Sequence, residues 1–172
     1  IEAEVGPVEI LVNNAGITRD AMFNKMTPEQ WDVVIKTNLY SIFNTTKQVY
    51  DGMVVRGWGR IINISSVNGI KGQAGQSNYS ATKAAIYGFN KSLAAECAKK
   101  GVTVNSISPG YIGTDMVRAI REDVLQKIVA TVPIGRLGEP SEIARTVAFL
   151  SADDAGLITG EDITVNGGLY YR

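Results

Sequence analysis

The stretch that decides the fold runs from Arg60 to Ile107 and reads RIINISSVNGIKGQAGQSNYSATKAAIYGFNKSLAAECAKKGVTVNSI. It begins and ends with short, mainly apolar and β-branched runs, Arg60–Ile64 and Val102–Ile107, which are typical of buried strands. Between these runs a long helical pattern extends from about Asn78 to Lys99. A strand, a helix and a second strand in this order predict two parallel strands joined by a right-handed crossover.

Two further strands and two further helices lie outside this unit. Ile10–Val12 and Ile163–Val165 have the same β-branched character. A helix begins after Thr27, where Thr-Pro-Glu-Gln forms a capping box with proline at the first helical position, and it ends near Gly57. Its expected buried face follows spacings of three and four and consists of Trp31, Ile35, Leu39, Ile42, Thr46, Val49 and Met53. The last long helix is expected from about Pro140 to Ser151.

Strands that alternate with long helices predict an α/β fold with a doubly wound, Rossmann-like parallel sheet in a single domain. The segment 111–133 departs from this alternation, because it holds two short helical patterns, Asp115–Ile120 and Asp123–Val132. Ligands of such sheets bind beyond the carboxyl ends of the strands. We therefore expect this insertion to act as a lid over the site.

The composition narrows the possible functions. Seventeen basic and seventeen acidic side chains give no net charge, so the charge balance favours neither a nucleic acid nor an anionic membrane as partner. The chain shows no bilayer-spanning apolar window and no signal-peptide pattern, and we expect a soluble, cytoplasmic protein. With no histidine and one cysteine, Cys97, a Ser-His-Asp triad, an internal disulfide and an ordinary zinc site are excluded. We predict no metal site and a packing role for Cys97.

Tyr79 and Lys83 carry the first signal of chemistry. They are four residues apart near the start of a predicted helix, so they share one face, one turn from each other. A free phenol has a pKa of about 10, and a nearby ammonium stabilises the phenolate and lowers that pKa. We expect this lowering for Tyr79. A pair with this spacing is also common on exposed helix surfaces, so its interpretation depends on the residues around it.

Several other segments converge on the same edge of the predicted sheet. Ser66 closes the strand Arg60–Ile64, where its hydroxyl could donate a hydrogen bond to a substrate carbonyl. Asn13-Asn14-Ala15-Gly16 ends the first strand, and Pro109-Gly110-Tyr111-Ile112-Gly113-Thr114 follows the third. Each feature alone is explained by a turn, a loop or a helix cap, and Asn38 by a solvated helix position. Their convergence at the carboxyl edge of one parallel sheet predicts an active site.

These motifs resemble the short-chain dehydrogenase/reductase family over the whole length of the chain. The family's Asn-Ser-Tyr-Lys tetrad falls on Asn38, Ser66, Tyr79 and Lys83. The resemblance implies hydride transfer between a nicotinamide cofactor and a carbonyl carbon. It assigns proton transfer to Tyr79, polarisation of the substrate oxygen to Ser66, and binding of the nicotinamide ribose to Lys83. Asn38 would hold a water that relays protons.

The resemblance also implies further contacts. The cofactor would be lined by Asn14, Ala15, Gly16, Pro109, Gly110, Ile112 and Thr114, together with Tyr79 and Lys83. For the substrate, Gln73, Gln76 and Tyr111 lie on the loops around the site, where pocket contact and a solvated loop remain open alternatives. The small residues Ala81, Ala84, Ala85 and Gly88 suit close helix packing between subunits as well as packing on the sheet. Because the family is usually tetrameric, we expect the first use and a homotetramer.

Local phrases resemble the family members that reduce acetoacetyl-CoA to (R)-3-hydroxybutyryl-CoA for polyhydroxybutyrate synthesis. These phrases are Thr46-Lys47-Gln48-Val49, Arg56-Gly57-Trp58-Gly59-Arg60, Ser65-Ser66-Val67-Asn68-Gly69 and Gly110-Tyr111-Ile112. The expected partner is an acyl-CoA thioester. Two alternatives stay open: a 3-oxoacyl acyl-carrier-protein reductase, with Arg118, Arg121 and Lys127 as a basic patch, and a non-catalytic scaffold.

One part of the family pattern is absent from this sequence. The glycine-rich turn between the first strand and first helix, which binds the cofactor phosphates, is not present, and neither is the residue that reads the ribose 2′ position. We therefore expect the chain to be the C-terminal portion of the fold, with an unpaired sheet edge that makes it poorly stable alone. The preference for NADPH is implied by the resemblance only.

Overall fold

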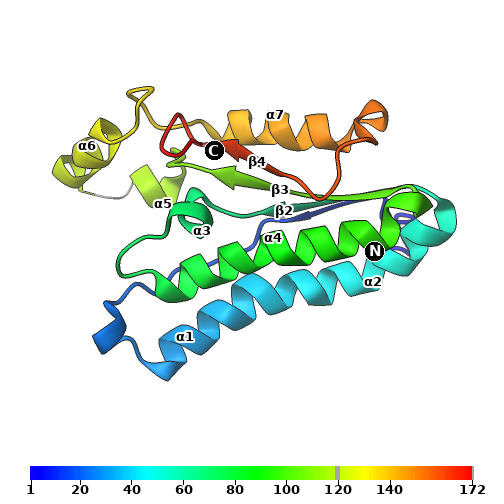
Figure 1. The fold of residues 1–172 in the computed structure, drawn as a ribbon, viewed down its shortest axis with the longest axis horizontal. Helices are drawn as coiled ribbons and strands as arrows, with labels where there is room; N and C mark the ends of the chain where they lie inside the picture. The colour runs from blue at the N-terminus through cyan, green and yellow to red at the C-terminus, as the bar shows by residue number, and fades with distance from the viewer. Residues whose placement is uncertain (119–120, 172) are drawn as a thin grey trace.

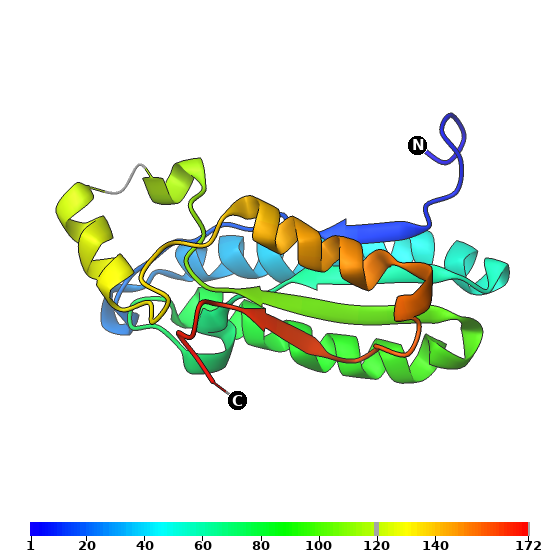
Figure 2. The same cartoon turned by 90° about the horizontal axis from the view of Figure 1, so that it is seen from above.

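The structure of the protein is a computed structural model that describes residues 1–118 and 121–171. Within these residues a parallel four-stranded sheet has the order β1-β2-β3-β4, as Figure 2 shows from above. The strands are β1 (Ile10–Asn13), β2 (Gly59–Ile64), β3 (Val102–Pro109) and β4 (Asp162–Val165). The register places Asn13 beside Asn63 and Asn63 beside Ser106, so the carboxyl ends of neighbouring strands lie together.

Helices cover both faces of the sheet, which confirms the predicted α/β class (Figure 1). One face is covered by α1, α2 and α4, and the other by α7. The α-helices are α1 (Pro28–Ile35), α2 (Ser41–Arg56), α3 (Val67–Lys71), α4 (Ser77–Cys97), α5 (Asp115–Arg118), α6 (Glu122–Ala130) and α7 (Pro140–Ser151). The shorter helical turns are η1 (Phe23–Lys25), η2 (Lys36–Tyr40), η3 (Ala98–Lys100) and η4 (Asp153–Ala155). Residues 119–120, the end of the first helical pattern predicted in the insertion, lie outside the described residues.

The predicted helix from Thr27 to Gly57 is divided in the structure. Its start is as expected, because Thr27 and Gln30 form the capping box, and Gly57 ends it in the left-handed conformation with φ of 74°. Between α1 and α2, however, Lys36–Tyr40 forms a π-helical turn. A π-helical turn contains one residue more than an α-helical turn, so the buried face before it is offset by one position from the face predicted with a regular helix. The buried positions here are consequently Val34 and Asn38, and the predicted Trp31, Ile35 and Leu39 are at least partly exposed.

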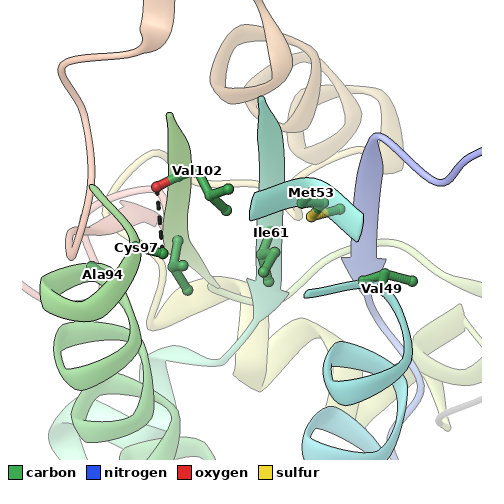
Figure 3. Close-up of a cluster of buried hydrophobic side chains, with 7 residues drawn as sticks. Val49, Met53, Ile61, Ala94, Cys97 and Val102 are labelled. Carbon is green, nitrogen blue, oxygen red and sulfur yellow. Dashed lines mark hydrogen bonds between the residues drawn. The ribbon is translucent and has the colours of Figure 1, made fainter. Parts of the chain in front are cut away.

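The hydrophobic core has one cluster on each face of the sheet. Ile61 points into a cluster with side chains of α2, α4 and β3, shown in Figure 3: Val49, Met53, Ala94, Cys97, Val102 and Val104. Ile62, the next residue along β2, packs on the other face with Ile107 and with Leu150 of α7. This alternation is the expected result of a strand buried on both faces. Cys97 is fully buried, in agreement with a packing role.

The elements at the carboxyl end of the sheet frame the site. Helices α5 and α6 lie beyond that end in Figures 1 and 2, and α3 follows β2 there. The short helix α3 was not predicted, because one turn of helix is too short to produce a periodic apolar pattern. Among the described helices, none combines the length and the apolar character that a bilayer crossing requires.

Candidate active site

The structure brings half of the predicted site residues together at the carboxyl ends of β1, β2 and β3. A cavity of about 220 Å³ lies there. It is lined by Asn14, Gly16, Ile17, Thr18, Ile64, Ser65, Ser66, Tyr79, Lys83, Pro109 and Gly110. Three strand ends and one helix therefore contribute to a single site, as expected for the carboxyl edge of a parallel sheet.

Ser66 is held at the junction between β2 and α3. Its backbone is extended, with φ of −165°, and its Oγ accepts a hydrogen bond from the Asn68 amide at 3.1 Å as the N-cap of α3. The Ser66 side chain lies close enough to the Tyr79 phenol to lower its pKa. The hydroxyl is thus fixed by the start of α3 while it faces the phenol.

Lys83 is a nearly buried cation on the floor of the cavity. Its side chain is 4% exposed, and its Nζ donates to the Ile64 carbonyl at 2.7 Å. Burial lowers the Lys83 pKa from its ordinary value to about 8. An ammonium has three N–H donors, so donors beyond the bond to Ile64 are available to a ligand in the cavity.

The pKa of Tyr79 shifts in the direction opposite to the predicted one. Burial raises it, the carboxylate of Asp20 raises it further, and the hydrogen bond with Ser66 lowers it. The Lys83 Nζ lies 5.6 Å from the centre of the Tyr79 ring. The expected lowering by Lys83 is not found, because the loss of solvent around the phenol is the larger effect.

Asn38 is fully buried in the π-helical turn and is not the solvated helix residue that the sequence left open. Its Oδ1 accepts from the Ile17 amide at 2.8 Å, and its Nδ2 donates to the Ile17 carbonyl at 2.9 Å and to Thr82 Oγ1 at 3.4 Å. One side chain thereby satisfies both main-chain groups of Ile17 and connects the loop after β1 to α4. Asn38 fixes one wall of the cavity.

Gly16 lines the cavity and lies close to two polar side chains of the site. A Cβ at this position would be in ordinary van der Waals contact with Asn38 Oδ1 at 3.5 Å and with Lys83 Nζ at 3.6 Å. An open cradle next to donors from Lys83, Ser66 and Tyr79 suits a sugar carrying hydroxyl groups. These residues therefore fit the ribose of a nicotinamide cofactor.

The remaining cofactor residues are divided between two neighbouring cavities. Pro109 and Asn14 line both the main cavity and a second one of about 450 Å³. Ile112 and Thr114 line only the second cavity of the two, beside α7. Ala15 is exposed and belongs to neither lining.

The three predicted substrate residues have different surroundings. Gln73 and Tyr111 line a groove of about 470 Å³ between the end of α3 and α6. Gln76 is instead bound on both sides, because its amide donates to Asp20 Oδ2 at 2.8 Å and accepts from Asn68 Nδ2 at 2.9 Å. Gln76 therefore links the segments that carry Asp20 and Asn68, whereas Gln73 and Tyr111 line an open groove.

Sequence reasoning missed four residues near the site. Ile17 and Thr18 line the cavity directly after the Asn-Asn-Ala-Gly motif, and an extension of that motif by two residues would have included them. Ser65 precedes Ser66, and its Oγ donates to the Lys83 carbonyl at 2.9 Å. Asp20 acts on Tyr79 from a loop, and no local pattern in the sequence indicates that contact.

The geometry defines the chemical class of the site. A half-buried phenol close to a serine hydroxyl, beside an ammonium and an open cavity, supplies a proton donor and hydrogen-bond donors for an oxygen. Within the described residues no group of histidine, cysteine or acidic side chains could hold a metal ion. This arrangement suits an enzyme that transfers a proton to or from a substrate oxygen beside a bound sugar.

Comparison with known proteins gives the family. The family model described as Enoyl-(Acyl carrier protein) reductase matches residues 1–170. The chain belongs to the short-chain dehydrogenase/reductase family, as its motifs predicted, and is an oxidoreductase that uses a nicotinamide cofactor.

Three relatives illustrate the similarity. The chain is 64% identical to an acetoacetyl-CoA reductase of Cupriavidus necator over 170 residues, which are 99% of this chain and 69% of the relative. It is also 64% identical to nodulation protein G of Azospirillum brasilense over 172 residues, 100% of this chain and 70% of the relative. Identity to the 3-oxoacyl acyl-carrier-protein reductase FabG of Salmonella typhimurium is 54% over 170 residues, 99% of this chain and 70% of the relative.

Proposed function

We propose that the protein reduces acetoacetyl-CoA to (R)-3-hydroxybutyryl-CoA with NADPH, in the cytoplasm, as a step of polyhydroxybutyrate synthesis. The observation that carries this proposal is the convergence of Ser66, Tyr79 and Lys83 on one cavity at the carboxyl edge of the sheet. The substrate is supported by the relatives named acetoacetyl-CoA reductase, which are up to 64% identical to this chain.

Each residue of the tetrad has a role that its contacts support. Tyr79 donates its proton to the carbonyl oxygen of the substrate, and its raised pKa keeps the phenol protonated at neutral pH. When the substrate is bound, the Ser66 hydroxyl beside Tyr79 donates its one proton to the same oxygen and stabilises the charge that develops on it. When bound, the reduced nicotinamide supplies the hydride.

Lys83 and Asn38 prepare the site for that transfer. Lys83 would bind the ribose hydroxyls of the cofactor through the N–H groups that it does not donate to Ile64, because its side chain lines the same cavity as Tyr79. Asn38 holds the Ile17 main chain and so shapes the wall that the ribose contacts. Asn38 would also hold a water that connects Lys83 to solvent for proton relay.

The insertion at 111–133 is proposed to act as a lid within the single domain. The groove between the end of α3 and α6 is proposed to bind the substrate. Tyr111 and Gln73 line this groove together with Val124 and Ile128 of α6. The 3-oxoacyl thioester lies against these side chains. Gln76 contributes by holding Asp20 and Asn68 in place beside the substrate.

The acyl carrier protein alternative is less favoured. It was expected to need a basic patch on the insertion, but Arg121 is paired with Asp123, to which its Nη2 donates at 2.8 Å. The side chain of Arg118 lies outside the described residues. Relatives named acetoacetyl-CoA reductase reach 64% identity, against 54% for the acyl-carrier-protein relative. The other alternative, a non-catalytic scaffold, would not require the intact tetrad.

A homotetramer is proposed for the working enzyme. Ala81, Ala84 and Gly88 are exposed along one face of α4, and a Cβ at Gly88 would meet no atom within 4 Å. A small-residue face of this kind allows close approach of a second helix. The proposal therefore assigns this face of α4 to contacts between subunits.

The test compares the two thioesters directly. Oxidation of NADPH is followed by absorbance with acetoacetyl-CoA and with the acetoacetyl thioester of acyl carrier protein, using the full-length natural polypeptide that carries this sequence. We expect kcat/KM to be at least tenfold higher for the CoA thioester. A preference for the carrier-protein thioester would replace the proposed substrate with the alternative, and turnover of neither would reject the function.

A further inference from the structure

Tyr87 lies on the same face of α4 as the catalytic pair but is not used in the chemistry proposed above. It is one turn beyond Lys83 and two turns beyond Tyr79. Its hydroxyl lies 3.0 Å from Ser65 Oγ, 3.1 Å from the Ser66 carbonyl and 3.0 Å from Ser108 Oγ. A single phenol thus joins the residues that follow β2 to the carboxyl end of β3.

The contact with Ser108 continues to β4. Ser108 is fully buried, and its Oγ donates to Asp162 Oδ1 at 2.7 Å. Ser106, also buried, donates to the same oxygen at 2.8 Å. The carboxylate of Asp162 therefore accepts two hydrogen bonds from serine hydroxyls of β3.

The number of protons fixes the direction of this chain of hydrogen bonds. An ionised carboxylate only accepts, and a serine hydroxyl has one proton to donate. Ser108 donates its one proton to Asp162, so Tyr87 must be the donor in the contact between Tyr87 and Ser108. The Tyr87 hydroxyl also donates to the Ser66 carbonyl, so its proton lies between two acceptors. Donation consequently runs outward from the site toward Asp162, and successive bonds in such a chain strengthen one another.

This chain acts on Ser66. The Tyr87 hydroxyl holds the Ser66 carbonyl, the Asn68 amide holds its Oγ, and the same Oγ faces Tyr79. A shift of the Ser66 peptide would therefore move the hydroxyl relative to the phenol. A misplacement of about 1 Å in a catalytic constellation is enough to lower a rate by about 10²-fold.

We propose that Tyr87 is a positioning residue of the reductase site, which keeps Ser66 aligned with Tyr79 through the chain Tyr87–Ser108–Asp162. The inference rests on the proposed function, because it assigns Tyr87 a part in the same reduction. It adds to the tetrad a residue two turns away on α4, together with two partners on β3 and β4.

The test removes one oxygen atom at a time. Tyr87→Phe keeps the ring and deletes the hydroxyl, Ser108→Ala breaks the link to Asp162, and the double variant combines both changes. Tyr50→Phe is the matched control, because Tyr50 is a partly buried tyrosine on α2 that packs against the core cluster around Val49 and Met53. All variants are made in the full-length natural polypeptide.

For Tyr87→Phe we expect kcat to fall about tenfold, which corresponds to roughly 1.4 kcal/mol, while KM for NADPH stays within about twofold. Ser108→Ala should have a smaller effect in the same direction, and the double variant should lose less than the product of the two single losses. Tyr50→Phe should keep the unmutated kcat.

The pH profile separates positioning from a general loss of structure. In the reverse direction, with 3-hydroxybutyryl-CoA and NADP, the rate rises with pH as Tyr79 ionises. The bond with Ser66 lowers the Tyr79 pKa, so misplacing Ser66 should move this limb to higher pH in Tyr87→Phe but not in Tyr50→Phe. A tenfold loss without that movement would assign Tyr87 a structural role only and overturn the inference, as would unchanged kinetics.

A separate readout keeps this inference independent of the substrate assignment. If the unmutated protein reduces no 3-oxoacyl thioester, the proposed function fails. In that case the ionisation of the Tyr79 phenol is followed by ultraviolet absorbance in the unmutated protein and in Tyr87→Phe. For each of the two, the signal of Tyr79 is the difference between that protein and the same protein carrying Tyr79→Phe. An upward movement of that titration in Tyr87→Phe would still support positioning, and an unchanged titration would reject it.

Discussion

At the scale of single residues, Lys83 shows a conflict between stability and function. Its ammonium is 4% exposed, and the interaction within hydrogen-bond range is with the neutral Ile64 carbonyl. Burial lowers its pKa from 10.5 to about 8, so the folded protein holds this charge at a cost. A residue that destabilises the fold while it faces the cavity is typical of a functional site.

The stability cost of Lys83 has a defined pH dependence. Below pH 8 the side chain is protonated in both the folded and the unfolded chain, and the penalty is fully present. Between pH 8 and about 10.5 the unfolded chain binds more protons, so the free energy of unfolding rises with pH in this window.

Lys83→Met should therefore increase the free energy of unfolding at pH 7, by about 1 to 3 kcal/mol after the lost bond to Ile64 is allowed for. The gain should shrink as the pH rises above 8, and the variant should be inactive. Urea unfolding of the variant and of the unmutated protein at pH 7 and at pH 10 measures the difference in the free energy of unfolding at each pH. A variant less stable than the unmutated protein at pH 7 would contradict this account of Lys83.

At the scale of elements, the π-helical turn Lys36–Tyr40 presents Asn38 to the loop after β1. Asn38→Leu keeps the volume similar but leaves the amide and the carbonyl of Ile17 without this partner. Each unsatisfied buried group costs roughly 1–3 kcal/mol, so we expect a loss of about 2–4 kcal/mol in the free energy of unfolding.

The control for Asn38 is Asn44→Leu on the exposed side of α2. Its effect should stay within about 0.5 kcal/mol, as for most surface substitutions. Both variants are compared by urea denaturation at pH 7. Equal effects at the two positions would mean that Asn38 does not hold the loop.

The elements also show which structural signals a sequence contains. Capping residues and β-branched runs are local, so Thr27, Gly57 and all four strands were predicted close to their observed positions. A π-helical turn adds a residue without changing composition, so the exposure of Trp31 and the burial of Val34 could not be read from spacing. The one-turn helix α3 is below the length at which periodicity is visible.

The site, like the fold, could be predicted from the sequence only where the signal is local. Residues joined by short motifs, such as Ser66, Tyr79 and Lys83, could be assigned because the topology of a parallel sheet brings strand ends together. Contacts between distant segments could not be assigned: Asp20 meets Gln76 across 56 residues, and Ser108 meets Asp162 across 54. The direction of the Tyr79 pKa was wrong because sequence shows the charged neighbour but not the burial.

At the scale of the whole molecule, β1 forms one edge of the described sheet and carries apolar side chains that are open to solvent. Ile10 is 43% exposed and Val12 is 39% exposed. An apolar edge strand offers unpaired main-chain groups to another chain. The 172-residue polypeptide on its own should therefore self-associate at micromolar concentration.

Val12→Lys should reduce this self-association, because a charged side chain on an edge strand opposes pairing. Val55→Lys serves as the control, since Val55 is 86% exposed but lies on α2, away from the edge. Sedimentation velocity over a range of concentrations measures both. Self-association that persists in Val12→Lys, or that is reduced equally by Val55→Lys, would contradict the role of the β1 edge.

The most direct test of the account is the reduction of acetoacetyl-CoA by the full-length natural polypeptide and by its Tyr79→Phe variant, with binding of NADPH measured for both. The account predicts turnover by the unmutated protein and a loss of about 10²- to 10⁴-fold in kcat for the variant, with a much smaller loss of cofactor affinity because Tyr79 is one of several proposed cofactor contacts. Turnover that survives in Tyr79→Phe would contradict the assignment of Tyr79 as the proton donor, and an inactive unmutated protein would contradict the proposed reduction itself.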